Sequence, residues 1–333
     1  MLSGKSVLVT GGTGSFGRRF VETVLDRYRP RRLIVFSRDE LKQQQMCDRI
    51  SPQVYPAIRY FLGDVRDRQR LYRALDGVDV VVHAAALKQV PRCEYNPLEA
   101  IKTNILGAAN VIDAAIDRDV DRVIALSTDK AANPINLYGA TKLCADKLFV
   151  SANNYTGSHP TRFSVVRYGN VVGSRGSVVP VFLKLRGQGP LPITDPRMTR
   201  FWITLEQGAD FVLASLQRMR GGEIFVPKIP SMNILDLTRA VAPDSPTETV
   251  GIRPGEKLHE TMVSEDDARH TLEYDDYFAV LPNPAALQFH READPQGGKP
   301  CDDGFCYTSD TNDRWLTVEQ LREMVEEEGG IAN

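Results

Sequence analysis

The amino-acid sequence predicts an α/β fold: a doubly wound parallel sheet followed by a smaller C-terminal lobe. Short, nearly continuous apolar runs recur through the first half of the chain and alternate with amphipathic stretches. Such runs are typical of strands that are buried on both faces of a parallel sheet. A glycine-rich turn follows the first run and polar segments follow later ones, so candidate ligand-binding groups lie where the strands end.

Six apolar runs are predicted as strands because each is short, rich in branched residues and bounded by polar or glycine residues. After the first run, Phe16, Phe20, Val24 and Tyr28 recur at intervals of four and predict one stripe of a helix. In chain order, the predicted strands span residues 6–10, 33–36, 58–62, 78–83, 122–127 and 163–167.

The second half of the chain is less regular. After about residue 168 glycine and proline become frequent, which favours loops and short elements. Residues 283–313 are rich in Pro, Asp, Gly and Asn and predict an irregular surface crossing, and Thr317 to Gln320 match a capping box that opens a terminal helix. We predict a sheet domain from residues 1–167 and 201–228, and a smaller lobe from residues 168–200 and 229–333.

Composition restricts the partners and the compartment. The chain has 333 residues, 42% of them hydrophobic and 25% charged, which suits a globular protein with a large core. A net charge of -2 predicts no nucleic-acid or membrane partner. No signal peptide or membrane-spanning apolar run is seen, and the five cysteines are scattered, so we expect a cytoplasmic protein. No metal site is expected, and the role of Cys301 and Cys306 stays open.

A glycine-rich turn separates the first strand from the first helix, with the spacing G-x-x-G-x-x-G. Glycines permit a tight turn and close approach of a pyrophosphate, and free N–H groups at the helix start bind the anion. A flexible loop is the alternative for the motif alone, but its place between a strand and a helix favours a Rossmann-type dinucleotide site. The expected contacts are Gly11, Thr13, Gly14, Ser15, Phe16 and Gly17.

The end of the second strand distinguishes NAD from NADP. An acidic residue there hydrogen-bonds the ribose hydroxyls of NAD, whereas an arginine accommodates the 2′-phosphate of NADP. Ser37, Arg38 and Lys42 supply a hydroxyl and two cations and so predict NADP. Asp39 and Glu40 are expected to cap the next helix, although they leave NAD open. Contacts to the adenine are expected from Asp64 and Val65.

Tyr138 and Lys142 stand four residues apart and therefore face the same side of a predicted helix. A phenol with a pKa of about 10 needs roughly 4 kcal/mol of phenolate stabilisation to titrate near pH 7. A nearby lysine and a cationic nicotinamide can together supply it. Alone, the pair could be a surface tyrosine and a solvated lysine; behind a nucleotide-binding turn, it favours a catalytic pair.

These motifs resemble the extended short-chain dehydrogenases/reductases that act on nucleotide sugars. More narrowly, the run Ser127 to Ala131, followed by Asn133 and Tyr138, resembles the UDP-N-acetylglucosamine 4,6-dehydratases, in the inverting branch of pseudaminic acid biosynthesis. Related retaining enzymes have Met where this chain has Tyr138. The resemblance covers about residues 4–280, and its further matching stretches are residues 37–42, 83–88, 167–171, 251–257 and 312–316.

The resemblance implies oxidation of the sugar at C4, elimination of water across C5 and C6, and return of hydride to C6 with inversion at C5. Tyr138 would be the base for C4 oxidation, Lys130 the base at C5, and Asp129 the acid for the departing C6 hydroxyl. Thr128 would bind the sugar's O4, and Lys142 would hold the nicotinamide ribose. We expect burial and the nicotinamide to lower the pKa of Lys130. An ordinary ion pair of Asp129 with Lys130 is the alternative.

The resemblance also implies a UDP-sugar partner, bound by the smaller lobe. Arg253 resembles an arginine that grips the diphosphate, because its fork matches phosphate geometry, and Arg200 is a second candidate. Asn170 is expected to bind a phosphate or the sugar. Glu256, Lys257 and Glu260 have a plainer alternative as helix-start charges. Further cofactor contacts are expected from Ala84, Ala85, Lys88 and Val171, and further substrate contacts from Lys88, Val178, Thr194 and Glu256.

Two helices, over residues 98–116 and 137–154, have apolar positions outside a single stripe. Family members pair such helices into four-helix interfaces, so a homo-oligomer, a dimer or a hexamer, is expected; packing on the sheet is the alternative. Two other functions stay open. A nucleotide-sugar 4-epimerase would share Tyr138 and Lys142 but has no use for Asp129 and Lys130, and a non-catalytic NADP-sensing module usually lacks one of the tyrosine–lysine pair.

Overall fold

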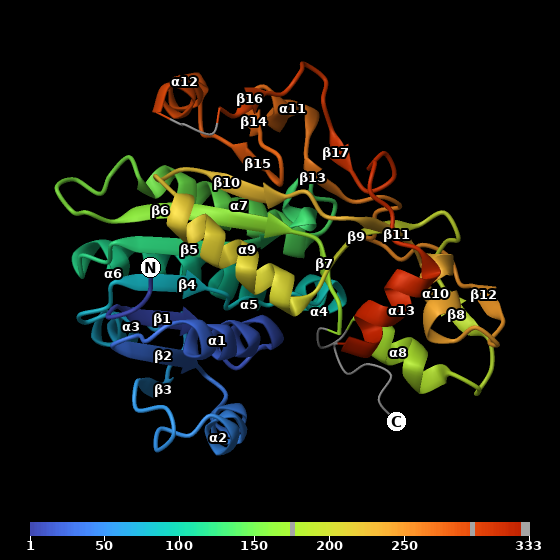
Figure 1. The fold of residues 1–333 in the computed structure, drawn as a ribbon, viewed down its shortest axis with the longest axis horizontal. Helices are drawn as coiled ribbons and strands as arrows, with labels where there is room; N and C mark the ends of the chain where they lie inside the picture. The colour runs from blue at the N-terminus through green and yellow to red at the C-terminus, as the bar shows by residue number, and fades with distance from the viewer. Residues whose placement is uncertain (174–176, 294–296, 328–333) are drawn as a thin grey trace.

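The computed structural model describes residues 1–173, 177–293 and 297–327, and a parallel sheet forms its centre (Figure 1). All six predicted strands are present within two residues of their predicted bounds, and the predicted α/β fold is confirmed. Each pairs in parallel with its neighbours, in the order β6-β5-β4-β1-β2-β3. The strands are β1 (Ser6–Thr10), β2 (Arg32–Ser37), β3 (Ile58–Leu62), β4 (Val80–His83), β5 (Arg122–Thr128) and β6 (Arg162–Tyr168).

Helices cover both faces of this sheet. In Figure 1, α1 (Ser15–Arg27) and α9 (Leu205–Arg218) cross the face turned to the viewer, and α7 (Leu137–Ala152) lies behind the sheet. All five residues of β1 are buried, as expected for a strand covered on both sides. The other helices around this sheet are α2 (Glu40–Arg49), α3 (Arg68–Ala74), α4 (Val90–Tyr95), α5 (Pro97–Ile101) and α6 (Gly107–Asp117).

A π-helical turn, Lys102–Leu106, joins α5 to α6, so the predicted helix over residues 98–116 is one continuous helical segment with a wider turn inside it. This π-helical turn points the side chain of Asn104 inward. The Asn104 amide donates hydrogen bonds to the Leu87 carbonyl at 2.9 Å and to Thr141 Oγ1 at 3.0 Å. This segment is thereby fixed against the loop after β4 and against α7. None of the described helices is both long and apolar enough to cross a membrane.

The sheet extends beyond the predicted strands to ten strands, in the order β16-β14-β15-β10-β6-β5-β4-β1-β2-β3. Three of the added strands pair antiparallel and come from the region that we predicted as the smaller lobe, so this region also completes the sheet. The division into two domains stays a prediction. The added strands are β10 (Ile224–Pro227), β14 (Thr271–Glu273), β15 (Tyr277–Val280) and β16 (Lys299–Pro300).

The expected irregular crossing over residues 283–313 is partly wrong, because its described residues include a helix, α12 (Pro284–Ala293), together with β16 and β17 (Tyr307–Thr308). Residues 294–296 lie outside the described part. The side chain of Asn283 accepts a hydrogen bond from the Ala286 N–H at 2.9 Å, and Pro284 follows it. An Asn cap followed by Pro is a helix start, a signal that the polar composition of the stretch concealed.

The smaller lobe lies beyond the carboxyl ends of the parallel strands, to the right in Figure 1. Three of its described helices share a second apolar core that contains Phe182 and Leu321, together with Trp202 from the range 201–228 that we predicted for the sheet domain. The predicted capping box at Thr317 is confirmed, because Thr317 and Gln320 exchange side-chain to backbone hydrogen bonds. The helices here are α8 (Val178–Leu185), α10 (Ile234–Val241) and α13 (Val318–Glu327). The strands are β7 (Asn170–Val171), β8 (Leu191–Ile193), β9 (Thr199–Ile203), β11 (Ser231–Asn233) and β12 (Thr247–Thr249).

Two short elements connect this lobe to the sheet: β13 (Thr261–Val263), which pairs antiparallel with β17, and α11 (Glu265–Ala268). The chain just before β13 passes the 3₁₀ turn Asp129–Ala131 that follows β5. A segment near residue 260 therefore reaches the carboxyl end of a strand that lies 130 residues earlier in the sequence.

Candidate active site

A cavity of about 880 Å³ opens at the carboxyl ends of the parallel strands. Its lining includes every residue that we predicted for the cofactor, from Gly11 to Val171, and all five predicted catalytic residues. Four of the predicted substrate residues line it as well: Lys88, Asn170, Arg253 and Glu256. The fold thus gathers residues from at least six separate segments around one space.

Close packing explains the glycine turn. Gly11 has a φ of +64°, and a Cβ there would lie 2.9 Å from the backbone of Ala84. A Cβ at Gly17 would lie 2.6 Å from the Gly11 carbonyl oxygen and from the Gly12 Cα atom. The turn therefore lies directly against the start of α1 and the end of β4, and the first-turn residues of α1 line the cavity, where helix-start N–H groups can bind a pyrophosphate. These residues fit a dinucleotide.

The end of β2 presents two cations beside carboxylates. The Arg38 guanidinium lies 3.6 Å from Asp64, and the Lys42 ammonium lies 2.7 Å from Asp39; both basic side chains are about half exposed. Asp39 caps α2, as predicted, by accepting a hydrogen bond from the Lys42 N–H at 3.0 Å. Thr13 and Ser37 share a hydrogen bond of 2.8 Å. The glycine turn and the end of β2 thus form one continuous polar edge.

Helix α7 begins at the site because Asn136 caps it, accepting a hydrogen bond from the Gly139 N–H at 2.7 Å. Its first turns place Tyr138 and Lys142 in the cavity wall, and both side chains are buried. Burial raises the pKa of Tyr138 to about 12, although Lys130 and a hydrogen bond with Thr128 act to lower it. The protein alone therefore favours the neutral phenol.

A buried chain of polar groups fixes the same helix. Burial lowers the pKa of Lys142, and the carboxylate of Asp146, one turn later, opposes that shift. Asp146 accepts a hydrogen bond from Ser127 at 2.7 Å and lies 3.6 Å from the buried guanidinium of Arg167. Helix α7, β5 and β6 are thus tied together behind the cavity, which holds the tyrosine–lysine pair in place.

The 3₁₀ turn after β5 carries the two residues predicted for the elimination. Thr128 donates a hydrogen bond to Asp129 Oδ1 at 2.8 Å, and the Lys130 ammonium lies 3.1 Å from the same oxygen. Asp129 is only 1% exposed. Burial raises the pKa of Asp129, the negative charge of Glu260 adds to that rise, and Lys130 opposes it.

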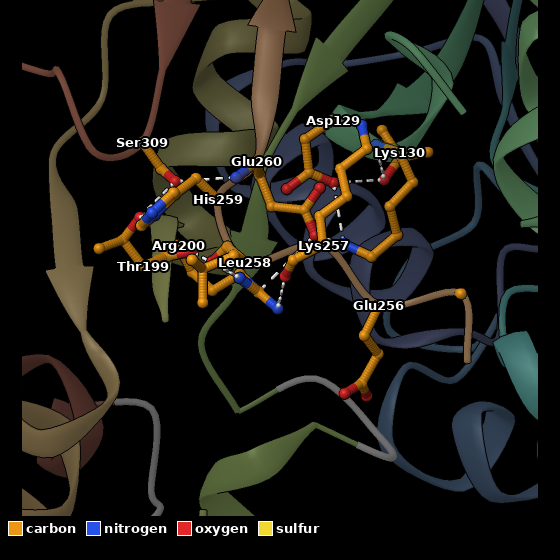
Figure 2. A network of polar contacts seen from close by, with 12 residues as sticks. Asp129, Lys130, Thr199, Arg200, Glu256, Lys257, Leu258, His259, Glu260 and Ser309 are labelled. Atoms are coloured by element: carbon orange, nitrogen blue, oxygen red, sulfur yellow. Dashed lines mark hydrogen bonds and ion pairs between the residues drawn. The ribbon is translucent and has the colours of Figure 1, made fainter. Parts of the chain in front are cut away.

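Glu260 is a site residue that the sequence did not identify. Its Oε1 lies 3.0 Å from the Lys130 ammonium, and the side chain is 2% exposed (Figure 2). Burial alone would lower the pKa of Lys130, but Asp129 and Glu260 together raise it above the ordinary lysine value. The structure thus differs from the expected lowering. The sequence offered one indication of a role for Glu260, namely its position just after the Arg253–Lys257 stretch. Its burial could not be predicted from the neighbouring residues.

Three predicted substrate residues, Val178, Thr194 and Arg200, are not among the described residues that line the cavity. The Arg200 guanidinium donates instead to the carbonyls of Thr199 at 2.6 Å, Lys257 at 3.0 Å and Leu258 at 3.0 Å (Figure 2). Val178 begins α8 and packs against the second core. A substrate role for these three residues stays a prediction, whereas Arg253, 65% exposed at the cavity, is accessible to a ligand.

A glycine-rich turn directly after β1, a buried Tyr-x-x-x-Lys pair and a doubly wound sheet define a short-chain dehydrogenase/reductase of the extended type. The model of the family described as "Polysaccharide biosynthesis protein" matches residues 7–282. The chain belongs to that family. Its predicted resemblance to the inverting UDP-N-acetylglucosamine 4,6-dehydratases is confirmed, since such an enzyme from Campylobacter jejuni is 54% identical, over 99% of this chain and 100% of the relative.

Other similar proteins span two activities. A UDP-glucose 4-epimerase of Rickettsia canadensis is 39% identical over 98% of this chain and 96% of its own length. The solved structure of Pen from Bacillus thuringiensis has a TM-score of 0.89, 35% identity and 99% coverage of each chain. A dTDP-glucose 4,6-dehydratase from Streptomyces venezuelae, solved with NAD bound, has a TM-score of 0.68 and 25% identity, covering 76% of this chain and 86% of that one.

Proposed function

We propose that this chain is a nicotinamide-dinucleotide-dependent UDP-N-acetylglucosamine 4,6-dehydratase that inverts C5, a hydro-lyase. The observation that carries the proposal is the pair of the buried Asp129 and the partly exposed Lys130, which lines the same cavity as Tyr138 and Lys142. Oxidation at C4 needs only the tyrosine and the lysine. An acid and a base beside them supply what elimination of water requires in addition.

The glycine turn, the end of β2 and Lys142 would hold the dinucleotide, which when bound would supply the oxidising equivalent at C4 and the reducing equivalent at C6. Tyr138 takes the proton of the C4 hydroxyl, and Thr128 hydrogen-bonds O4. Because burial raises the pKa of Tyr138 to about 12, further from neutral pH, positive charge from Lys142 and the bound ligand is needed to make it a base.

Elimination follows because the C4 ketone acidifies the proton on C5. Lys130 takes that proton, the electron pair left on C5 forms the C5–C6 double bond, and the C6–O bond breaks. Asp129 gives its proton to the departing oxygen, which leaves as water. A proton from solvent, delivered to C5 on the opposite face after C6 is reduced, would give the inverted configuration. Atoms and charge balance because the acid and the base exchange states.

The 4-epimerase is the second candidate, since epimerases are among the similar proteins. An epimerase does not need the Asp129–Lys130 pair, which favours the dehydratase. Incubation with UDP-N-acetylglucosamine tests the proposal: mass spectrometry must show a product that has lost one water. NMR of the product formed in D2O must show a C6 methyl group, deuterium at C5 and inverted C5 configuration. A product of unchanged mass with inverted C4 would establish the epimerase instead.

We further propose NADP as the preferred dinucleotide, since Ser37, Arg38 and Lys42 provide a hydroxyl and two cations at the end of β2. A similar protein, the dTDP-glucose 4,6-dehydratase from Streptomyces venezuelae, was solved with NAD bound, so the preference for NADP over NAD has to be measured. Comparison of the two dissociation constants by calorimetry tests the choice. Tighter binding of NAD would contradict it, and it would place Asp39 on the ribose hydroxyls.

We also propose that the protein is a cytoplasmic homo-oligomer and that it acts in pseudaminic acid biosynthesis. Large apolar side chains are exposed along α4, α5 and the π-helical turn: Tyr95 is 83% exposed, Leu98 67% and Leu106 53%. Pairing such a face in a dimer would bury it. Light scattering after size exclusion gives the mass in solution, and a monomer at micromolar concentration would contradict the assembly.

A further inference from the structure

Glu260 lies behind the acid–base pair and not in the cavity wall. Asp129 and Lys130 line the cavity, but Glu260 is not among the described lining residues. Its carboxylate lies 3.0 Å from the Lys130 ammonium, while Asp129 lies 3.1 Å from the same nitrogen. The lysine nitrogen is thus held from two sides, by one carboxylate that faces the substrate space and by one that does not.

The backbone of Glu260 is fixed by hydrogen bonds to a distant segment. Its N–H donates to the Ser309 hydroxyl at 2.9 Å, and the Ser309 N–H donates to its carbonyl at 2.8 Å. The Ser309 hydroxyl in turn shares a hydrogen bond of 2.7 Å with Thr199. Arg200, whose Nε lies 3.6 Å from Glu260, is itself held by three carbonyls (Figure 2). A carboxylate anchored in this way is a rigid partner for a lysine.

Resting on the proposed function, we infer that Glu260 is the positioning residue of the elimination step: it orients the amine of Lys130 and stabilises the ammonium that forms when Lys130 takes the proton from C5. Glu260 then does for the lysine base what a buried carboxylate does for a catalytic histidine. It remains an anion throughout and exchanges no proton with the substrate.

The proton count of the cluster supports this role. With Lys130 charged and both carboxylates ionised, the three groups carry one net negative charge. Moving one proton across the 3.1 Å contact from Lys130 to Asp129 makes the base and the acid at once, without any change in net charge. The second oxygens of Asp129 and Glu260 are buried without hydrogen-bond partners within the described part of the chain, so each remains an open acceptor.

The charge of Glu260 acts on both partners. It raises the pKa of Lys130 by attraction and adds to the rise in the pKa of Asp129 by repulsion. The active state is the pair that shares one proton, so activity is lost at low pH when the pair gains a second proton and at high pH when it loses the first. Removing the negative charge lowers both pKa values, and both limbs of the pH–rate profile move to lower pH. The other charged or titratable groups that face this cluster are Lys88, Tyr138, Arg200 and Lys257.

Glu260→Gln tests the inference, because the amide keeps the size of the side chain and removes its charge. For dehydration of UDP-N-acetylglucosamine, kcat is expected to fall about a hundredfold, and both limbs of its pH profile are expected to move down by about 1 unit or more. Binding of the dinucleotide is expected to be unchanged. A lower rate with both limbs in place would show a merely structural role and overturn the inference.

The matched control is Glu273→Gln, which removes the charge of another Glu–Lys pair: Glu273 lies 2.7 Å from the Lys228 ammonium and is not among the described residues that line the cavity. It is expected to keep the wild-type rate and profile, and a displaced profile there would also overturn the inference. Glu260→Asp keeps the charge on a shorter side chain, so its rate falls while its limbs stay in place. If Glu260→Gln does not fold, displaced limbs in Glu260→Asp count against the inference. If the wild-type protein does not dehydrate UDP-N-acetylglucosamine, the proposed function itself is wrong. This result is distinct from a failure of the inference about Glu260.

Discussion

The two ends of the cavity are built in different ways. The dinucleotide end is built from three short segments: the glycine turn, the end of β2 and the start of α2. Most of the contacts of these segments are to residues close in sequence or to the adjacent strand. The acid–base end joins Lys130 to Glu260, two residues 130 positions apart. The first depends on close backbone packing, and the second depends on charges brought together in a buried place. Substitutions should therefore affect them separately.

The largest effect is expected at the acid–base end. Lys130→Ala removes the proposed base, and dehydration should fall by about 10³-fold or more, as expected for loss of a general base. Dinucleotide binding, which depends on the other end, should be retained. Mass spectrometry of the product and calorimetry with the dinucleotide measure the two separately. Full dehydration activity in this variant would remove the base assignment.

Gly17→Ala attacks the other end through packing. The added methyl group meets backbone atoms at 2.6 Å, and these cannot move as a side-chain tip would. We expect a loss of about 1–3 kcal/mol of folding stability together with weaker dinucleotide binding. Thermal unfolding with and without the dinucleotide checks both. Wild-type stability and affinity would mean that the turn and α1 are less tightly packed than the structure indicates.

Arg38→Ala sharpens the comparison within the dinucleotide end. If the guanidinium binds the 2′-phosphate, the Kd for NADP rises about tenfold, which is about 1.4 kcal/mol, and the Kd for NAD stays the same. The effect should shrink in high salt, because Arg38 is half exposed. An equal loss of affinity for NADP and NAD would mean that Arg38 contacts the adenine or supports the fold, and does not bind the 2′-phosphate.

The smallest effect is expected at α13, whose described residues line neither end of the cavity. Thr317→Ala removes one hydrogen bond of the capping box at α13, and it should cost about 1 kcal/mol of stability. Dehydration and dinucleotide binding should both be unchanged at a temperature where the protein is folded. A large loss of activity in this variant would mean that the smaller lobe closes on the substrate through α13.

What the sequence could predict follows from the range of the interactions. Periodic apolar runs determine the six strands, and the glycine spacing with its flanking strand and helix determines the phosphate turn, because backbone sterics and burial act on neighbouring residues. The capping box at Thr317 was readable for the same reason. Tyr138 and Lys142 share a helix, so their spacing alone placed them on one side.

Only the tertiary structure decided the electrostatics of the catalytic end. The sequence led us to expect a lowered pKa for Lys130, because burial was foreseen and a second carboxylate was not. Glu260 reaches that lysine only because the segment before β13 is hydrogen-bonded to Ser309 and passes the end of β5. Likewise, only the tertiary structure shows that the Arg200 guanidinium donates to three backbone carbonyls, while its expected phosphate contact stays a prediction. Charge interactions depend on distance in space and on exclusion of water, and neither can be read from local patterns along the chain.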